Sequence, residues 1–503
     1  MIGDALAGKR IGVTGGTGFL GTALVERLLR SVPDCEVVVL IRPGRRGAAE
    51  RARREILRND CFDRLRGELG DRFEAETTRR LAAVAGDVSQ DGLGLSVADA
   101  ETLASCDVVI HSAAAVSFES PLDSAVEVNL LGPSRVAGVL RAPTHLVAVS
   151  TAYVAGSRRG DAPEALLPDT PFATEVGWRQ EVAAARRARA DTDAASREPD
   201  RLARFHKQAR AELGAAGTPL LAERSERLRQ DWVDHRLVEL GRARAQGLGW
   251  PDAYAYTKAL GERALLETRG DLPVTIVRPS IIESALAEPV PGWIRGFRMA
   301  EPVIISYGRG LLKEFPGIPE GVVDVIPVDL VVAAVLAVAA AGPEPGEPTV
   351  YQVASGVRNP LHYRRLVDLV RAWFTDHPLY DSEGQPIVVP EWSFPGRGRV
   401  QRQLQRATKS LATAEDVIRA LPVRGRQAEF SSRLEERRAM AERALGYVQL
   451  YGAYTETEAR FRVDRLLALW DTLDAGDHEA FAFDPGAIDW DRYVQEIHLP
   501  SVV

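Results

Sequence analysis

The chain is poor in the residues that build disulfides and zinc sites. It holds three cysteines, Cys35, Cys61 and Cys106, with no C-x-x-C pair and no neighbouring histidine cluster. An odd, scattered set of this kind argues against a disulfide framework and against a zinc site. We therefore expect a reducing compartment and no bound metal.

Long hydrophobic runs are also lacking. The longest uncharged apolar run, residues 330–341, falls far short of the roughly 20 residues that span a bilayer. It reads as a buried helix capped by Asp329. The opening "MIGDALAGKR" has no hydrophobic signal core, so we expect a cytoplasmic location.

An excess of positive charge is missing as well. The 63 Lys and Arg residues are outnumbered by 70 Asp and Glu residues, which leaves a formal net charge of -7. Such a chain has no bulk attraction to nucleic acid or to anionic membranes, so an anionic ligand must meet a local patch. We expect no nucleic-acid partner, and peripheral membrane contact through the C-terminal region is left open.

Strand-like runs alternate with helical runs along the first 350 residues. The strand candidates are "RIGVT", "EVVVLI", "LAAVAG", "DVVIHSAA", "HLVAVSTAYV" and "VTIVRPS". Their continuous Val, Ile and Ala content is typical of strands buried on both faces of a parallel sheet. The pattern predicts an α/β fold with a doubly wound, Rossmann-like parallel sheet.

Two further regions interrupt or follow this alternation. Residues 157–250 are rich in Ala, Arg, Leu and Glu and predict a helical insertion; positions 178–245 hold 15 Lys or Arg against 11 Asp or Glu. This excess is explained by solvated helix faces, or alternatively by a docking surface for a multiply phosphorylated ligand. We expect a nucleotide-binding domain at 1–356 and a mainly helical domain at 357–503.

The stretch "VTGGTGFLGTALVERLL", residues 13–29, places glycines between a strand and a helix. Gly16, Gly18 and Gly21 fit G-x-G-x-x-G, and Gly15, Gly18 and Gly21 fit the looser T-G-x-x-G-x-x-G that Thr14 begins. Glycine allows a tight turn and close approach to a pyrophosphate, which the helix N-terminus attracts. The stretch predicts a nucleotide-binding turn.

A second group of residues could move protons. The strand "HLVAVSTAYV" ends in Ser150 and Thr151, and Tyr254 precedes Lys258 by four residues, which places the latter pair on one helix face. An ammonium lowers the pKa of a nearby phenol, so the tyrosine could exchange a proton with a substrate oxygen that the strand-end hydroxyl polarises. Tyr256 should face elsewhere.

These motifs resemble the extended short-chain dehydrogenase/reductase superfamily. More narrowly, "HSAAAVSFESPLDSAVEVNLLGP", "RPSIIESAL", "PGWIRGF", "YGRGLLKEFPG", "DVIPVDLVV" and "IDWDRYVQEIHLP" are similar to fatty acyl-CoA reductases with a male-sterility-type C-terminal domain. The resemblance covers nearly the whole chain. It implies NADPH-dependent reduction of a long-chain acyl-CoA, through an aldehyde, to a primary fatty alcohol.

The resemblance also implies roles for single residues. Tyr254 would donate the proton, Lys258 would lower its pKa and hold the nicotinamide ribose, and Thr151 would be the third hydroxyl, with Ser150 as its alternative. His111 reads as a packed histidine and Asn129 as a structural asparagine. The implied cofactor contacts are Thr14, Gly15, Gly16, Thr17, Gly18, Phe19, Leu20, Gly21, Arg42, Arg45, Asp87, Val88, Ala113, Ala114, Lys258 and Pro279.

The end of the second predicted strand bears on cofactor choice. Arg42 stands where an NAD-specific enzyme often has an acidic residue that binds the ribose 2′-hydroxyl, with Arg45 and Arg46 close behind. A guanidinium there suits the 2′-phosphate of NADPH. A surface basic turn is the alternative.

An aromatic-rich stretch could form a wall for an acyl chain. It contains Trp293, Phe297, Tyr307 and Phe315 among glycines and prolines, although such residues are as often plain core. An acyl carrier protein could deliver the chain in place of CoA. The alternatives are a thioester reductase that releases the aldehyde, a sugar-nucleotide epimerase, and a regulatory protein that binds NADP without turnover; oligomeric state and chain-length preference stay open.

Overall fold

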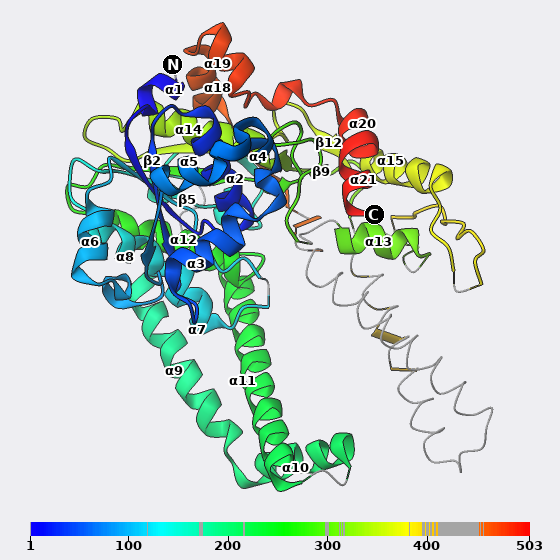
Figure 1. Ribbon diagram of the computed structural model, residues 1–503. Coiled ribbons are helices and arrows are strands. Elements are labelled where there is room, and N and C mark those ends of the chain that lie inside the picture. The colour runs from blue at the N-terminus through cyan, green and yellow to red at the C-terminus, as the bar shows by residue number, and fades with distance from the viewer. Residues whose placement is uncertain are drawn as a thin grey trace. The chain divides into compact units, whose positions relative to one another are not determined.

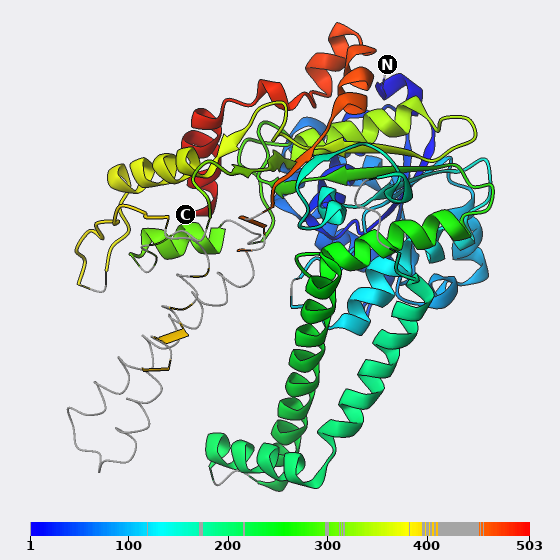
Figure 2. The same cartoon turned by 180° about the vertical axis from the view of Figure 1, so that it is seen from behind.

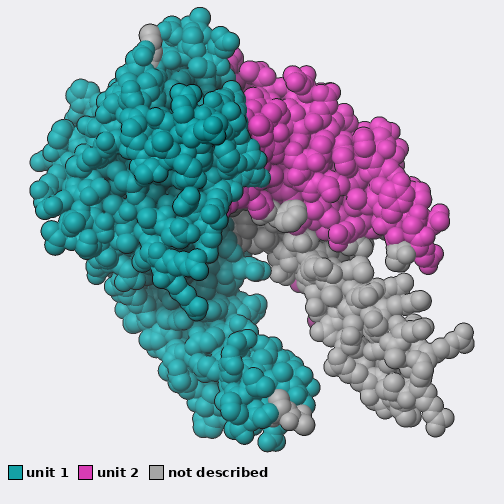
Figure 3. Space-filling view, viewed as in Figure 1, with its two compact units in different colours: residues 1–280, 329–353, 461–483 teal, residues 281–328, 354–460, 484–503 magenta. Residues whose placement is uncertain are grey.

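The computed structural model describes residues 2–117, 119–170, 175–214, 217–296, 301–310, 317–381, 383–394 and 457–503, with isolated residues at 312, 314 and between 398 and 455. The chain divides into two compact units, each built from three segments (Figure 3). Residues 1–280, 329–353 and 461–483 form the first unit, and residues 281–328, 354–460 and 484–503 form the second.

A seven-stranded parallel sheet forms the centre of the first unit. Its strand order is β11-β7-β5-β4-β1-β2-β3, and every neighbouring pair is parallel. The strands are β1 (Arg10–Thr14), β2 (Glu36–Ile41), β3 (Leu81–Ala85), β4 (Val108–His111), β5 (His145–Val149), β7 (Val274–Pro279) and β11 (Thr349–Val353). The predicted doubly wound α/β fold is confirmed.

Strand order reverses direction beside β1, which pairs with β2 on one side and with β4 on the other. In the register, Val13 lies opposite Val39 in β2 and Ile110 in β4. In open α/β sheets, ligands bind at the carboxyl ends of the strands at such a reversal. We therefore expect a ligand to bind near the residues that follow β1 and β4.

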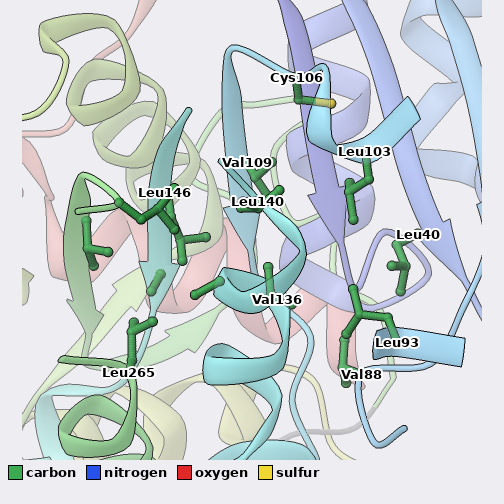
Figure 4. Close-up of a cluster of buried hydrophobic side chains, with 14 of the residues drawn as sticks. Leu40, Val88, Leu93, Leu103, Cys106, Val109, Val136, Leu140, Leu146 and Leu265 are labelled. Carbon is green, nitrogen blue, oxygen red and sulfur yellow. The ribbon is translucent and has the colours of Figure 1, made fainter. Parts of the chain in front are cut away.

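The sheet is buried on both faces, as its uninterrupted apolar strands require. Alternate residues such as Val38, Leu40, Leu146 and Ala148 contribute to a core cluster with side chains of α6 (Val97–Ala104), α8 (Gly132–Val139) and α12 (Ala253–Thr268). Figure 4 shows Leu103, Val136 and Leu265 from these helices in this cluster. On the other face α2 (Phe19–Ser31) packs against β1 and β2.

The remaining helices of the first unit complete its layers. They are α1 (Ile2–Leu6), α3 (Gly47–Ala52), α4 (Asp63–Leu69), α5 (Phe73–Arg80), α7 (Leu122–Ala125), α14 (Val328–Ala341), α18 (Asp464–Asp471) and α19 (Ala475–Ala480). The apolar run predicted to be a buried helix lies in α14, which is buried along nearly its whole length. Because α14 begins at Val328, Asp329 lies in its first turn and does not precede it as a cap.

The predicted insertion forms a helical arm. Its three helices are α9 (Trp178–Ser196), α10 (Pro199–Leu213) and α11 (Thr218–Leu248). Figures 1 and 2 show α9 and α11 as two long helices that extend from the sheet, with α10 at the far end. The part before α9 is not helical throughout, since β6 (Gly160–Ala162) and a 3₁₀ turn (Leu167–Asp169) lie there.

Most of the arm's positive charge is neutralised locally. Of the 15 Lys and Arg side chains at 178–245, ten form ion pairs with carboxylates. Arg204, Lys207 and Arg210 are exposed on α10. The pairing supports the solvated-face explanation of the charge excess, because most of these cations already have partners.

The second unit contains short strands and helices. They are β8 (Ile281–Glu283), β9 (Val322–Val323), β10 (Val325–Pro327), β12 (Leu361–His362), α13 (Glu301–Gly308), α15 (Tyr363–Asp376), α20 (Trp490–Arg492) and α21 (Leu499–Val502). β10 pairs with β8 in parallel, and β12 pairs with β9 in antiparallel. Most of residues 395–456 lie outside the described residues, so the mainly helical domain expected at 357–503 stays a prediction. None of the helices in the described part of the chain is both long enough and apolar enough to cross a bilayer.

Candidate active site

The glycine-rich turn connects β1 to α2 and leaves no room for a side chain at Gly15 or Gly21. Gly15 has a φ of +76°, and a Cβ there would lie 2.7 Å from the backbone nitrogen of Ala113. A Cβ at Gly21 would lie 2.1 Å from the carbonyl oxygen of Gly15. Gly18 precedes α2, and no side chain caps the helix. An uncapped helix N-terminus above a turn made of glycine fits the pyrophosphate of a dinucleotide.

Thr14, the last residue of β1, connects the start of this turn to the end of β4. It is fully buried, and its hydroxyl lies 2.7 Å from Nδ1 of His111 and accepts a hydrogen bond from the backbone nitrogen of Ala113 at 3.2 Å. The side chain thus joins the ends of β1 and β4. Burial, aided by the charge of Lys258, lowers the pKa of His111 to about 3, so this imidazole is neutral and structural at physiological pH.

Asn129 fixes the loop that follows β4. Its side-chain amide accepts a hydrogen bond from the backbone nitrogen of Ala115 at 2.8 Å and donates to the carbonyl oxygen of Ala115 at 3.0 Å. It also donates to the hydroxyl of Thr257 on α12 at 3.2 Å. Because the loop carries Ala113 and Ala114, Asn129 connects the expected cofactor wall with the helix of Tyr254.

The proton-transfer candidates lie on α12 and at the ends of two strands. Asp252 caps α12 by accepting a hydrogen bond from the backbone nitrogen of Ala255 at 2.9 Å. The ammonium of Lys258 donates to the carbonyl oxygen of Val149, the last residue of β5, at 2.9 Å. Thr151 donates to the carbonyl oxygen of Pro279 at the end of β7 at 3.4 Å. The helix is therefore joined to the strand ends at the carboxyl edge of the sheet.

The pKa of Tyr254 is raised, whereas the proximity of Lys258 predicted that it would be lowered. Burial raises it, and the charge of Asp252 adds to the increase. The ammonium of Lys258 donates to the Val149 carbonyl, and burial lowers its own pKa to about 8. Tyr254 is therefore protonated at neutral pH, the form that an acid requires.

Tyr256, also on α12, binds a residue of the helical arm. Its side chain is buried, and its hydroxyl donates a hydrogen bond to the carboxylate of Glu181 on α9. Arg244 on α11 donates to the same carboxylate at 3.0 Å. This bond attaches α12 to the base of the helical arm. No sequence pattern predicts this role for Glu181, because its partner Tyr256 lies 75 positions away.

The arginines expected to bind a 2′-phosphate follow β2. Arg42, Arg45 and Arg46 are all exposed, and the structure records no ion pair for their side chains with any described residue. Asp87 lies two residues after the end of β3, where its carboxylate accepts hydrogen bonds from the backbone nitrogen and the hydroxyl of Ser89 at 2.9 and 2.8 Å. Val88 beside it is buried.

Two further buried hydroxyl groups, those of Ser150 and Ser280, lie at strand ends. Ser150 is the alternative to Thr151 as the third hydroxyl, and Ser280 had no predicted role. Ser150 and Ser280, which follow β5 and β7, each have an Oγ atom without a hydrogen-bond partner in the described part of the protein. The position of Ser280 as the last residue of the predicted strand "VTIVRPS" is the signal that could have identified it as a candidate.

The aromatic stretch lies largely in the second unit. Tyr307 is fully buried, donates to the carbonyl oxygen of Pro390 at 2.6 Å and packs on Trp392 with ring centroids 4.1 Å apart. Trp293 is buried as well. Phe297 and Phe315 lie outside the described residues, so the acyl-chain wall stays a prediction.

Comparison with known proteins places this geometry in context. Residues 13–335 match the NAD-binding family described as male sterility protein. The chain is 31% identical to fatty acyl-CoA reductase 2, chloroplastic, of Arabidopsis thaliana, over 99% of this chain and 78% of that protein. It is 29% identical to the alcohol-forming fatty acyl-CoA reductase of Simmondsia chinensis, over 99% of this chain and 97% of that protein.

Solved structures support the fold. The terminal R domain of the myxalamid PKS-NRPS pathway aligns with a TM-score of 0.56 at 17% identity, over 94% of this chain and 90% of that one. The reductase domain of a non-ribosomal peptide synthetase from Mycobacterium tuberculosis aligns with a TM-score of 0.52 at 19% identity, over 99% of this chain and 94% of that one.

Proposed function

The chain belongs to the fatty acyl-CoA reductase family, and on that premise we propose that it uses NADPH to reduce a long-chain acyl-CoA, through the aldehyde, to a primary alcohol. The observation that carries the proposal is the attachment of α12 to the carboxyl edge of the sheet. Through Lys258 and Val149 this bond holds the helix of Tyr254 at the end of β5, where Thr151 follows. An acid and a second hydroxyl are thus available at the edge where the glycine turn also lies.

NADPH is the cofactor that the charges favour. A 2′-phosphate carries negative charge that a guanidinium binds by charge-assisted hydrogen bonds. Arg42, Arg45 and Arg46 supply three exposed guanidinium groups directly after β2. At that strand end an NAD-specific enzyme would more often present a carboxylate to the ribose 2′-hydroxyl.

The residues of this chain would act on the substrate oxygen. When bound, NADPH supplies a hydride to the carbonyl carbon. Negative charge then develops on the oxygen, where the hydroxyl of Tyr254 would donate a hydrogen bond. The hydroxyl of Thr151 would do the same after turning away from the Pro279 carbonyl, to which it now donates. Collapse of the tetrahedral thioester adduct breaks the carbon–sulfur bond, and the CoA thiolate leaves with the electron pair.

The aldehyde can be reduced with the same residues. Tyr254 would give its proton to the alkoxide that forms, and solvent would restore the proton. In total, two NADPH and two protons convert one acyl-CoA into one alcohol and one free CoA. Because the same acid serves both steps, one site is enough for a four-electron reduction.

Stoichiometry distinguishes this function from release of the aldehyde. We expect purified protein with excess NADPH and a long-chain acyl-CoA to consume two NADPH for each CoA thiol released and to yield the primary alcohol. One NADPH per thiol, with aldehyde accumulating and added aldehyde left unreduced, would assign the chain to the aldehyde-forming thioester reductases. Absence of any NADPH consumption with acyl-CoA or acyl carrier protein would favour a regulatory protein that binds NADP without turnover.

A cytoplasmic location remains our prediction, together with an acyl-CoA substrate whose chain length is open. The exposed cations of α10, Arg204, Lys207 and Arg210, are where peripheral contact with an anionic membrane or an acidic carrier protein would be sought first. Binding to anionic vesicles that vanishes when these three residues are replaced by Ser would support such contact.

A further inference from the structure

Three buried polar side chains meet in the second unit, at a place that the proposed chemistry does not use. Glu283 lies in β8, Glu301 begins α13, and His498 ends the helical turn Tyr493–His498. Their exposed fractions are 3%, 0% and 4%. One carboxylate oxygen of each glutamate and one ring nitrogen of the histidine all lie within 4.8 Å of one another.

The imidazole of His498 is held in a fixed orientation. Its Nδ1 lies 2.9 Å from the hydroxyl of Ser284, which in turn lies 3.2 Å from the hydroxyl of Tyr493. Tyr493 also donates to the backbone carbonyl of Ser284 at 2.8 Å, and its ring stacks on His498 with an interplanar angle of 19°. Because these contacts occupy Nδ1, Nε2 is the nitrogen left to face the glutamates.

Imidazole nitrogens and carboxylate oxygens are both common ligands of divalent transition metals. The three side chains bring such donor atoms together at a buried place.

We propose that Glu283, Glu301 and His498 bind one divalent transition-metal ion, with Zn²⁺ as the best match. Two carboxylate oxygens and one imidazole nitrogen are a mixed set that Zn²⁺ accepts in four-coordinate sites, whereas Mg²⁺ and Ca²⁺ prefer oxygen throughout. The hydrogen bond that Nδ1–H of His498 would donate to the Ser284 hydroxyl is the outer contact that metal-ligating histidines usually carry, and it leaves Nε2 unprotonated for the metal. The fourth position would be left for water.

The geometry needs little adjustment. Tetrahedral Zn²⁺ with bonds of about 2.0–2.1 Å brings its ligand atoms about 3.4 Å apart. The three donor atoms lie within 4.8 Å of one another, so side-chain rotation could close the set without moving the backbone far. Because the three ligands come from β8, α13 and the C-terminal helical turn, the ion would join segments distant in sequence and stabilise the fold of the second unit. The histidine is far from both glutamates in the sequence, which is why spacing alone predicted no metal.

Metal content of the full, untagged chain tests this assignment. After dialysis with Zn²⁺ and removal of loose metal, elemental analysis should give about one Zn²⁺ per chain, with weaker retention of Mn²⁺ and little of Mg²⁺. Glu283→Gln and His498→Gln should lose the ion. Glu164→Gln is the matched control, because Glu164 is a half-buried carboxylate of the first unit whose recorded hydrogen bonds all come from backbone nitrogens; this variant should keep the ion.

Two further measurements keep the test decisive if a variant folds poorly. Ser284→Ala should raise the Zn²⁺ dissociation constant by roughly ten- to a hundredfold, and Ser284→Thr should restore the wild-type value. A chelator should lower the melting temperature of the wild type and leave that of Glu283→Gln unchanged. A wild-type chain that retains no Zn²⁺, or equal retention by the wild type and Glu283→Gln, would overturn the proposal and leave a buried polar cluster held by protons.

Discussion

Replacing Gly21 by alanine probes the nucleotide turn at its tightest point. The added Cβ would lie 2.1 Å from the carbonyl oxygen of Gly15, 2.7 Å from its carbonyl carbon and 2.9 Å from the Cα of Gly16. All three atoms belong to the backbone, so no side-chain rotation relieves the overlap. Ordinary contact begins near 3.4 Å, so the turn and the start of α2 must separate by about 1.3 Å.

That displacement is large compared with the tolerance of a hydrogen bond. Backbone donors bind phosphate oxygens near 2.9 Å, and such charge-assisted bonds contribute about 1.5–3 kcal/mol each. Loss of one of them weakens NADPH binding by about tenfold to somewhat above a hundredfold. We expect Gly21→Ala to raise the NADPH dissociation constant on the order of a hundredfold and to lower the melting temperature.

Two other glycines make the experiment a graded series. A Cβ at Gly18 would meet only the Gly15 carbonyl oxygen, at 3.1 Å, and a Cβ at Gly138 on α8 would meet no atom within 4 Å. Gly18→Ala should therefore weaken binding less, and Gly138→Ala should bind normally and gain up to about 1 kcal/mol from helix propensity. Calorimetric titration of NADPH, with a melting curve for each variant, measures both effects. Gly21→Ala that binds NADPH as tightly as Gly138→Ala would refute the close-packing argument.

The other predictions concern proton transfer, cofactor choice and acid stability. Tyr254→Phe should lower turnover by roughly two orders of magnitude or more with little change in NADPH affinity, because it removes a positioned acid; Tyr256→Phe should be milder, and the reverse order would exchange the two roles. Arg42→Asp should raise the NADPH Michaelis constant more than that of NADH, because a carboxylate would face the 2′-phosphate; equal use of both cofactors by the wild type would contradict this. The free energy of unfolding of the first unit should fall as pH drops from about 6.5 toward 4, since burial lowers the folded pKa of His145 to about 4 and of His111 to about 3, so the unfolded chain binds protons that the folded chain does not. The loss should be on the order of 3 kcal/mol for His145, and denaturant titrations in which His145→Gln shows the same pH slope as the wild type would contradict this assignment.

The sheet could be predicted from the sequence because its signals are local. Six apolar runs each contain one of the observed strands, and the glycine turn lies between β1 and α2 as its spacing indicates. β11, which contains Thr349–Val353, was not predicted. Its sequence "TVYQV" is short and mixes polar with apolar residues without a regular period, and its place in the sheet depends on pairing with β7, a partner distant in sequence.

The candidate site shows the same division between local and distant effects. Helical spacing placed Tyr254 and Lys258 on one face, but it could not show that the Lys258 ammonium binds the Val149 carbonyl 109 positions away. Nor could it show that burial, with Asp252, raises the pKa of Tyr254. Charge counting found the excess on the arm, whereas pairing with residues of other elements, such as Glu127 with Arg186, depends on the folded structure.

The three-segment construction of the first unit affects how the chain folds during synthesis. The carboxylate of Asp477 accepts hydrogen bonds from the backbone nitrogen of Ile2 at 3.0 and 3.1 Å, and that of Glu164 accepts one from Leu466 at 3.2 Å. At about 5–20 residues per second a ribosome needs roughly 10–40 s to pass from residue 280 to residue 483. β11 lies only about 70 residues beyond residue 280, so the nascent sheet has no β11 at its β7 edge for roughly 4–15 s, whereas Ile2 has no Asp477 until the last segment emerges. An edge strand left open in this way invites pairing with other chains, so chaperone binding to β7 is expected until β11 emerges.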